Sequence, residues 1–240
     1  DESTGLPKPS YDLWEEKYGV STFTAASVYG GLIGASRFAG LLGKDRGELL
    51  YQTFAEKIKK GILDYLYDEK DGYFYKLLYK KGKEERIDKT LDVSSIYSLY
   101  AFDLLDISDE KIEKSIKLAH DKLQIKTQIG GFPRYEDDYY YRVSKETPGN
   151  PWIITTLWIA QYYIKKAKQE KDLNPVVDWL HWACSHALPS GILSEQINPL
   201  NGEQLSASPL VWSHAEFVVT VLLYLEKLEK LGICKVSLPD

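Results

Sequence analysis

Ser10-Tyr11-Asp12-Leu13-Trp14-Glu15-Glu16-Lys17-Tyr18-Gly19 places a tryptophan and two adjacent carboxylates directly before a long apolar segment, residues 22–42. The stretch is too short to form a stable helix by itself. Asp12 and Glu15 have the spacing of a capping box, so one interpretation is a local cap. The other interpretation is a carbohydrate site, in which the indole packs on a sugar ring and a carboxyl acts on the glycosidic oxygen. The spacing alone leaves both interpretations open.

The rest of the chain alternates between two kinds of predicted helix. Apolar helices are expected over residues 22–42, 93–105, 151–165 and 209–228, and amphipathic or mixed helices over 48–67, 110–123 and 175–187. A helix that is apolar all round is buried, whereas an amphipathic helix lies at the surface. In a simple bundle every helix would be amphipathic. The alternation therefore predicts an all-α fold with an inner ring of helices wrapped by an outer ring.

One hairpin is the only β-structure that the pattern predicts. Its strands are expected at residues 73–79 and 83–87, joined through Lys81-Gly82. A sheet of four or more strands would contradict this expectation.

The unusual loops all enter the N-terminal ends of the apolar helices. They are Trp14-Glu15-Glu16, Asp88-Lys89-Thr90-Leu91-Asp92, Arg134-Tyr135-Glu136-Asp137-Asp138, Gly149-Asn150-Pro151-Trp152, Ser194-Glu195-Gln196 and Gly202-Glu203-Gln204. Inner helices of a double ring run parallel, so these loops should meet at one mouth, where helix N-termini favour negative charge. A mouth lined by carboxylates, aromatic rings and an arginine is typical of a glycoside hydrolase.

These segments, in this order, resemble glycoside hydrolase family 15, the glucoamylase family. The resemblance also includes Leu205-Ser206-Ala207 and Trp212-Ser213, and it covers most of the chain. It implies an (α/α)6 barrel. The seven helices would be its helices six to twelve, so residues 1–240 are expected to be the C-terminal part of a single catalytic domain whose first helices are absent.

The resemblance also implies roles for individual residues. Glu15 matches the general acid, Glu16 a substrate-binding carboxylate and Glu195 the general base that activates water. Trp14 is expected to form an apolar wall beside the acid.

Three further residues match positions around the leaving-group sugar. Arg134 and Asp138 match residues beside that subsite, and Trp152 matches an aromatic residue near it. The family's proline after Arg-Tyr is replaced here by Glu136.

These roles imply an inverting hydrolase that releases glucose from the non-reducing ends of α-glucans or malto-oligosaccharides. Inversion requires two carboxyl groups about 6.5–9.5 Å apart, one to protonate the departing oxygen and one to activate water. Two alternatives are kept: an α,α-trehalase of the same family, and a non-catalytic carbohydrate-binding relative. For Asp92, a helix N-cap is the preferred interpretation.

Composition excludes several other classes of protein. The net charge is −5 and no basic stripe is present, so no nucleic-acid partner is expected. No apolar run is long enough to span a membrane. The four histidines lack the spacing of a metal site, so neither a metal nor another cofactor is predicted. Two cysteines cannot form a disulfide framework, which slightly favours the cytoplasm and leaves the compartment open.

The expected partial ring has consequences for partners. The chain begins at Asp1 and contains no methionine, which predicts that it is cut from a longer protein. Inner helices left uncovered would expose a large apolar surface. We therefore expect residues 1–240 to be inactive alone, and to bind the missing N-terminal part or a second copy of themselves.

Overall fold

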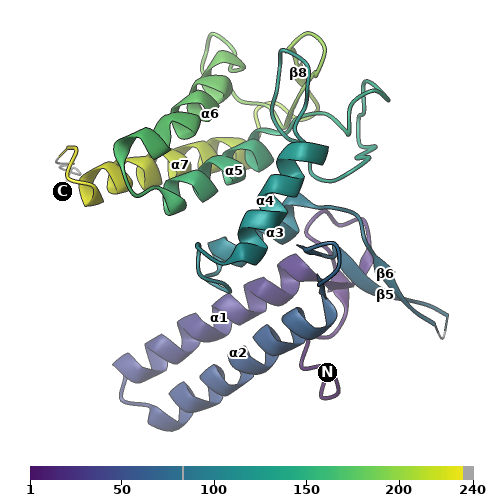
Figure 1. Ribbon diagram of the computed structural model, residues 1–240, viewed down its shortest axis with the longest axis vertical. Helices are drawn as coiled ribbons and strands as arrows, with labels where there is room; N and C mark the ends of the chain where they lie inside the picture. Colours follow the sequence, from purple (N-terminus) through teal and green to yellow (C-terminus); the bar gives the residue numbers. More distant parts are fainter. Residues whose placement is uncertain (83, 235–240) are drawn as a thin grey trace. The chain divides into compact units, whose positions relative to one another are not determined.

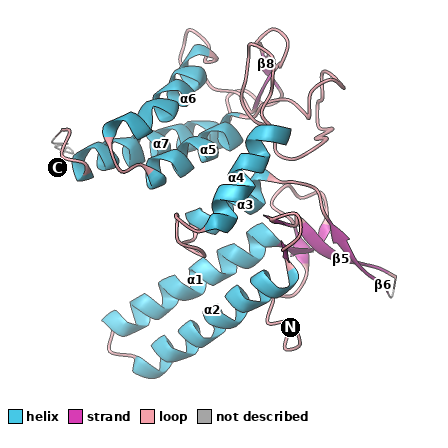
Figure 2. Cartoon of the chain, viewed as in Figure 1, coloured by secondary structure: helices cyan, strands magenta, loops and turns pink. Residues whose placement is uncertain are grey.

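The computed structural model describes residues 1–82 and 84–234. The chain divides into two compact units, Asp1–Leu118 and Ala119–Asp240, and each is described by itself. Seven α-helices lie in the described part of the chain, and helices are the main element of both units (Figures 1 and 2). In this part no helix is both long enough and apolar enough to cross a membrane.

The first unit is built on two long helices and a small sheet. Helices α1 (Thr22–Leu41) and α2 (Asp45–Tyr65) lie side by side (Figure 1). The short helix α3 (Val93–Ala101) packs on α1, and α4 (Glu110–Lys122) contains the boundary between the units.

The first unit also holds an antiparallel sheet of four short strands, so the expectation of a single hairpin is wrong. Its order is β1 (Ser10–Tyr11), β2 (Tyr18–Ser21), β5 (Leu77–Lys81) and β6 (Glu84–Asp88). The strands β1 and β2 flank the Trp14 turn. They are only two and four residues long, which is too short for a visible alternation of apolar and polar residues.

The predicted hairpin itself is shifted. The first part of the predicted strand, β4 (Tyr73–Phe74), pairs with β3 (Tyr67–Asp68). The pairing with β6 begins only at Leu77. The expected first residue of the second strand, Lys83, lies outside the described residues.

The second unit contains three packed helices and two short strands. Helix α5 (Ile153–Lys166) packs against α6 (Asn174–Ser185) and α7 (Val211–Lys230), and a 3₁₀ turn, η1 (Glu170–Leu173), precedes α6. Strands β7 (Gln196–Ile197) and β8 (Gln204–Leu205) form a hairpin in the loop before α7. The core here consists of Ile153, Leu157, Trp182, Ala183, Leu193 and Ile197.

Burial confirms two of the four predicted inner helices. Most residues of α3 and α5 are buried. Helix α1 buries only one side, and Phe38 on it is 63% exposed. Helix α7 buries only Ser213 and Thr220. Within the described residues, α1 and α7 are therefore not buried all round as their composition alone indicates, but each leaves an apolar face exposed, as the expectation of a partial ring implies.

The expected apolar stripe of α2 is also only partly buried. Ile58 and Ile62 face the core, whereas Leu50 and Phe54 are about half exposed. The core-facing stripe therefore covers only the second half of this helix.

Candidate functional site

In the first unit, the Trp14 motif forms a tight turn between β1 and β2. The backbone N–H of Asp12 donates to the carbonyl of Lys17, and the N–H of Glu15 donates to the carbonyl of Asp12 at 3.1 Å. Glu15 is exposed and has a φ of 57°, in the left-handed region that side chains other than glycine rarely adopt. Such strain is found where surrounding contacts over-determine the backbone.

Asp12 does cap this turn, although not as a helical capping box. Its Oδ1 accepts hydrogen bonds from the backbone N–H groups of Glu16 at 2.9 Å and Lys17 at 3.2 Å. Asp12 therefore has the predicted local capping role, while the Glu15 side chain is exposed.

The motifs before α1 and α3 meet in the structure. The indole N–H of Trp14 donates to Asp92 Oδ2 at 2.9 Å, across 78 residues of sequence. Asp92 is the N-cap of α3, as predicted, since its Oδ1 accepts from the backbone N–H of Ser94 at 2.7 Å. The same carboxylate therefore begins a buried helix and holds the tryptophan beside Glu15.

Lys76, for which sequence reasoning predicts no role, lies in the same cluster. Its side chain is only 2% exposed, and its Nζ is 3.2 Å from Asp92 Oδ2 and 3.7 Å from Asp12 Oδ2. A signal for it exists in the sequence, since Lys76 interrupts the aromatic and apolar run from Tyr73 to Tyr79.

In the second unit, the three residues expected near the leaving-group sugar lie together. Arg134 forms a two-pronged ion pair with Asp138, with Nε–Oδ2 and Nη2–Oδ1 distances of 2.8 and 2.7 Å, and both side chains are buried. The guanidinium lies 4.7 Å from the ring centre of Trp152 and 5.2 Å from that of Tyr140. The arrangement holds the arginine in one orientation among aromatic rings.

Glu195 is attached to this cluster through backbone pairing. Trp152, the N-cap of α5, forms a β-bridge with Gln196, and the N–H of Ile153 donates to the carbonyl of Glu195 at 3.2 Å. The side chain of Asn150 connects the two loops by donating to Gln196 Oε1 at 2.8 Å. The motifs before α5 and α7 therefore meet, as the motifs before α1 and α3 do.

The Glu195 carboxylate is partly buried and held from one side. Its Oε2 accepts hydrogen bonds from Ser206 Oγ and from Gln196 Nε2, the latter at 3.4 Å. Within the described residues, no hydrogen bond to Oε1 is present. Two side chains thus fix one oxygen of the carboxylate.

The segment before Glu195 is fixed by the start of α7. Ser213 Oγ donates to the carbonyl of Ser194 at 2.7 Å, and the N–H of Leu193 donates to His214 Nε2 at 3.1 Å. The sequence indicated Ser213 and Gln196 only as members of motifs, whereas the structure shows which groups they hold.

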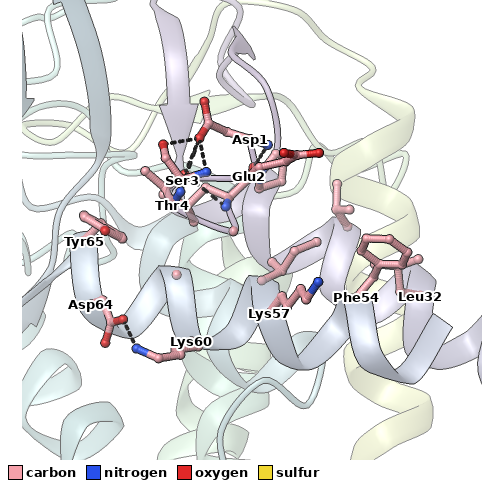
Figure 3. A pocket seen from close by; sticks show the side chains of 16 residues that line it. Asp1, Glu2, Ser3, Thr4, Leu32, Phe54, Lys57, Lys60, Asp64 and Tyr65 are labelled. Atoms are coloured by element: carbon pink, nitrogen blue, oxygen red, sulfur yellow. Dashed lines mark hydrogen bonds and ion pairs between the residues drawn. The ribbon is translucent and has the colours of Figure 1, made fainter. Parts of the chain in front are cut away.

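No predicted site residue lines the cavity shown in Figure 3. This cavity, of about 820 Å³, lies between residues 1–7 and the helices α1 and α2. Within the described ranges, no cluster of three or more His, Cys, Asp or Glu side chains could hold a metal ion.

Comparisons with known proteins agree on one family. The family model "Glycosyl hydrolases family 15" matches residues 5–178 and 176–222. The chain is 32% identical over 222 residues to an uncharacterized glycosyl hydrolase of Methanocaldococcus jannaschii, with coverage of 89% of this chain and 34% of the relative. It is 28% identical over 247 residues to a probable glucoamylase of Schizosaccharomyces pombe, with coverages of 87% and 53%.

A trehalase is also among the relatives. Trehalase 1 of Sulfolobus acidocaldarius is 23% identical over 193 residues, with coverages of 74% and 32%. The chain thus spans between about a third and about a half of the length of these curated relatives.

Solved structures confirm the expected fold class. A crystal structure of a bacterial glucoamylase in complex with acarbose superposes with a TM-score of 0.75 at 25% identity, covering 89% of this chain and 35% of that one. The fold is that of the family's (α/α)6 barrels.

Proposed function

We propose that this chain, which belongs to glycosyl hydrolase family 15, supplies the two catalytic carboxylates of a glycoside hydrolase that releases glucose from the non-reducing ends of α-glucans or malto-oligosaccharides. Glu15 is the general acid and Glu195 the general base. Trp14, Glu16, Arg134, Asp138 and Trp152 form the substrate-binding surroundings.

The way in which the Glu195 carboxylate is held carries this proposal. Ser206 and Gln196 donate to one oxygen, so the carboxylate is oriented and its charge is stabilised, while the other oxygen accepts no hydrogen bond within the described residues. A general base must lie within hydrogen-bond reach of the proton that it removes. The two hydrogen bonds orient the Glu195 carboxylate, and within the described residues it forms no ion pair that would occupy it.

The neighbouring cluster supports sugar binding next to this base. The exposed ring of Tyr140 offers an apolar body with a polar tip, and the buried ring of Trp152 lies beside it. Asp138 holds the orientation of Arg134 through two hydrogen bonds, so the positive charge of the arginine has a fixed position beside these rings.

A substrate can reach the Glu15 side chain, which is exposed and lies on a fixed turn. The side chain projects from a strained residue whose two neighbours are held by Asp12 and Asp92. In the reaction, Glu15 donates its proton to the glycosidic oxygen as the C–O bond breaks. Glu195 removes a proton from a water molecule, which attacks the anomeric carbon from the opposite face. The product is β-glucose from an α-linkage, and this requires about 6.5–9.5 Å between the two carboxyl groups.

An α,α-trehalase is the second candidate, since a trehalase is among the relatives. The same pair of carboxylates would act on an α,α-1,1 bond. Glucose release from maltose, soluble starch and trehalose by the natural protein that carries these 240 residues separates the two. Preference for maltose and starch supports the proposal, preference for trehalose supports the second candidate, and hydrolysis of none of them contradicts both.

The residue roles are tested separately in the same protein. Glu15→Gln and Glu195→Gln should each lower kcat strongly, whereas Glu146→Gln, an exposed glutamate outside both clusters, should leave it unchanged. NMR of the first product should show β-glucose. Either glutamine variant with wild-type kcat, or α-glucose as the first product, overturns the assigned mechanism.

A further inference from the structure

Lys76 is a buried cation placed between two buried carboxylates. Its Nζ lies 3.2 Å from Asp92 and 3.7 Å from Asp12, and all three side chains are almost completely shielded from solvent. Its backbone is held between two elements, because its N–H donates to the carbonyl of Asp88 and its carbonyl accepts from Thr22. Burying a charge is costly unless it is paired, so the fold must compensate this cost through a defined geometry.

The two carboxylates hold opposite ends of the Trp14–Glu15–Glu16 segment. Asp92 accepts the indole N–H of Trp14, and Asp12 accepts the backbone N–H of Glu16. Glu15 lies between these two attachment points with a φ of 57°. The direction of the Glu15 side chain therefore depends on both attachments being present together.

We propose that Lys76 is a positioning residue for the general acid. Its ammonium group lies within 4 Å of both carboxylates and holds them close to one another, and through them it fixes the direction of Glu15. Without this cation the two carboxylates repel each other in a site with little water. The proposal rests on the role of Glu15 given above. It adds a residue that touches no substrate and acts through the two aspartates.

An acid-positioning defect has a chemical signature that a loss of folding lacks. A sugar leaving group must be protonated as the bond breaks, whereas fluoride leaves with little need of a proton. A protein in which only Glu15 is misplaced should therefore cleave its natural disaccharide slowly and α-glucosyl fluoride nearly normally. Misplacement by about 1 Å can cost on the order of 100-fold in rate.

The experiment compares kcat and KM for both substrates in Lys76→Met and in the wild-type natural protein. We expect a fall in kcat for the disaccharide of roughly 10- to 100-fold with little change in KM, and a much smaller fall for the fluoride. Lys60→Met is the control, because it removes an exposed lysine that pairs with Asp64 on α2 in the same unit, and it should leave kcat for both substrates unchanged.

A second variant covers the case in which Lys76→Met does not fold. Lys76→Met combined with Asp12→Asn leaves one carboxylate in the cluster, so the repulsion is removed, and circular dichroism checks its folding. It should show a selective loss on the disaccharide as well, because Asp92, which holds Trp14, still lacks its cation, and the amide introduced at position 12 accepts the N–H of Glu16 less strongly than a carboxylate does. Equal losses on both substrates, or none, in the variant that folds overturn the positioning role.

The Glu15→Gln variant separates a failure of the general-acid role of Glu15 from a failure of the positioning role of Lys76. If Glu15→Gln keeps wild-type kcat on the disaccharide, Glu15 is not the acid and the proposed function fails. If Glu15→Gln is inactive on the disaccharide and Lys76→Met is not, only the positioning role fails.

Discussion

The guanidinium of Arg134 donates to both carboxylate oxygens of Asp138, four residues later in the chain, while its flat face lies over Trp152. The pair is buried, so each charge depends on the other for compensation. The two hydrogen bonds therefore hold residues 134–138 of the loop before α5 in one conformation.

Arg134→Ala should destabilise the chain by about 3–5 kcal/mol, because it leaves Asp138 buried without its partner. Arg134→Lys should recover only part of this loss, since an ammonium group cannot donate the two parallel hydrogen bonds. Urea unfolding of residues 1–240 measures both. The control is Arg86→Ala, which removes a surface ion pair with Glu84 and should change the free energy of unfolding by no more than about 0.5 kcal/mol. Equal effects of Arg134→Ala and Arg86→Ala would contradict the prediction.

Ser206→Ala removes the hydroxyl that donates to Glu195. A hydrogen bond to a charged group contributes about 1.5–3 kcal/mol, and we expect about tenfold lower kcat in the natural protein because the base loses its orientation. Steady-state kinetics on the disaccharide measures the change. Ser208→Ala is the control, since Ser208 is exposed and donates to Gln204 rather than to Glu195. Unchanged kcat in Ser206→Ala would show that the hydroxyl does not support the base.

The hydrogen bonds of Asp68 predict that the first unit loses folding stability in acid. The backbone N–H of Asp71 and the hydroxyl of Tyr75 donate to its carboxylate, and with Lys89 beside it they lower the pKa of Asp68 to about 2. Because the folded pKa is below the unfolded value of about 3.9, this carboxylate stabilises the fold above that value. The stabilisation is lost as the pH falls toward about 2.

The measurement is the difference in unfolding free energy between wild type and Asp68→Asn across the pH range from about 5 to 2. The difference should shrink as the pH falls. Asp64→Asn, which removes an exposed ion pair with Lys60 on α2, should show a small difference throughout. A constant difference for Asp68→Asn would mean that its hydrogen bonds do not depend on ionisation.

The exposed apolar side of α1 predicts self-association of residues 1–240. Phe38 and Leu41 are 63% and 85% exposed on the same helix, next to the exposed Leu42. Contiguous apolar surface of this kind promotes contact between molecules. Sedimentation should show species heavier than the 27.4 kDa chain at increasing concentration, and Phe38→Glu with Leu41→Glu should shift them toward that mass. A chain that stays monomeric at every concentration would contradict this.

Sequence patterns located the helices well because helical periodicity is a local property. The predicted and observed ends of α3 and α5 differ by at most four residues, and the N-cap role of Asp92 was also predicted. The four-stranded sheet was missed because strands such as Ser10–Tyr11 have too few residues to show a period. The composition of α1 shows that its faces are apolar but does not show which of them another element covers, and in the described residues one face stays exposed.

The sequence by itself determined the family, the alternation of helix types and the identity of the candidate carboxylates, since each of these depends on residues in order along the chain. Only the tertiary structure decided which groups hold those carboxylates. Trp14 meets Asp92 across 78 residues, and Lys76 joins them from a third segment. The physical reason is that a buried charge or hydrogen-bond donor must be satisfied by whatever the fold brings within about 3 Å, and that choice is made in space rather than along the chain.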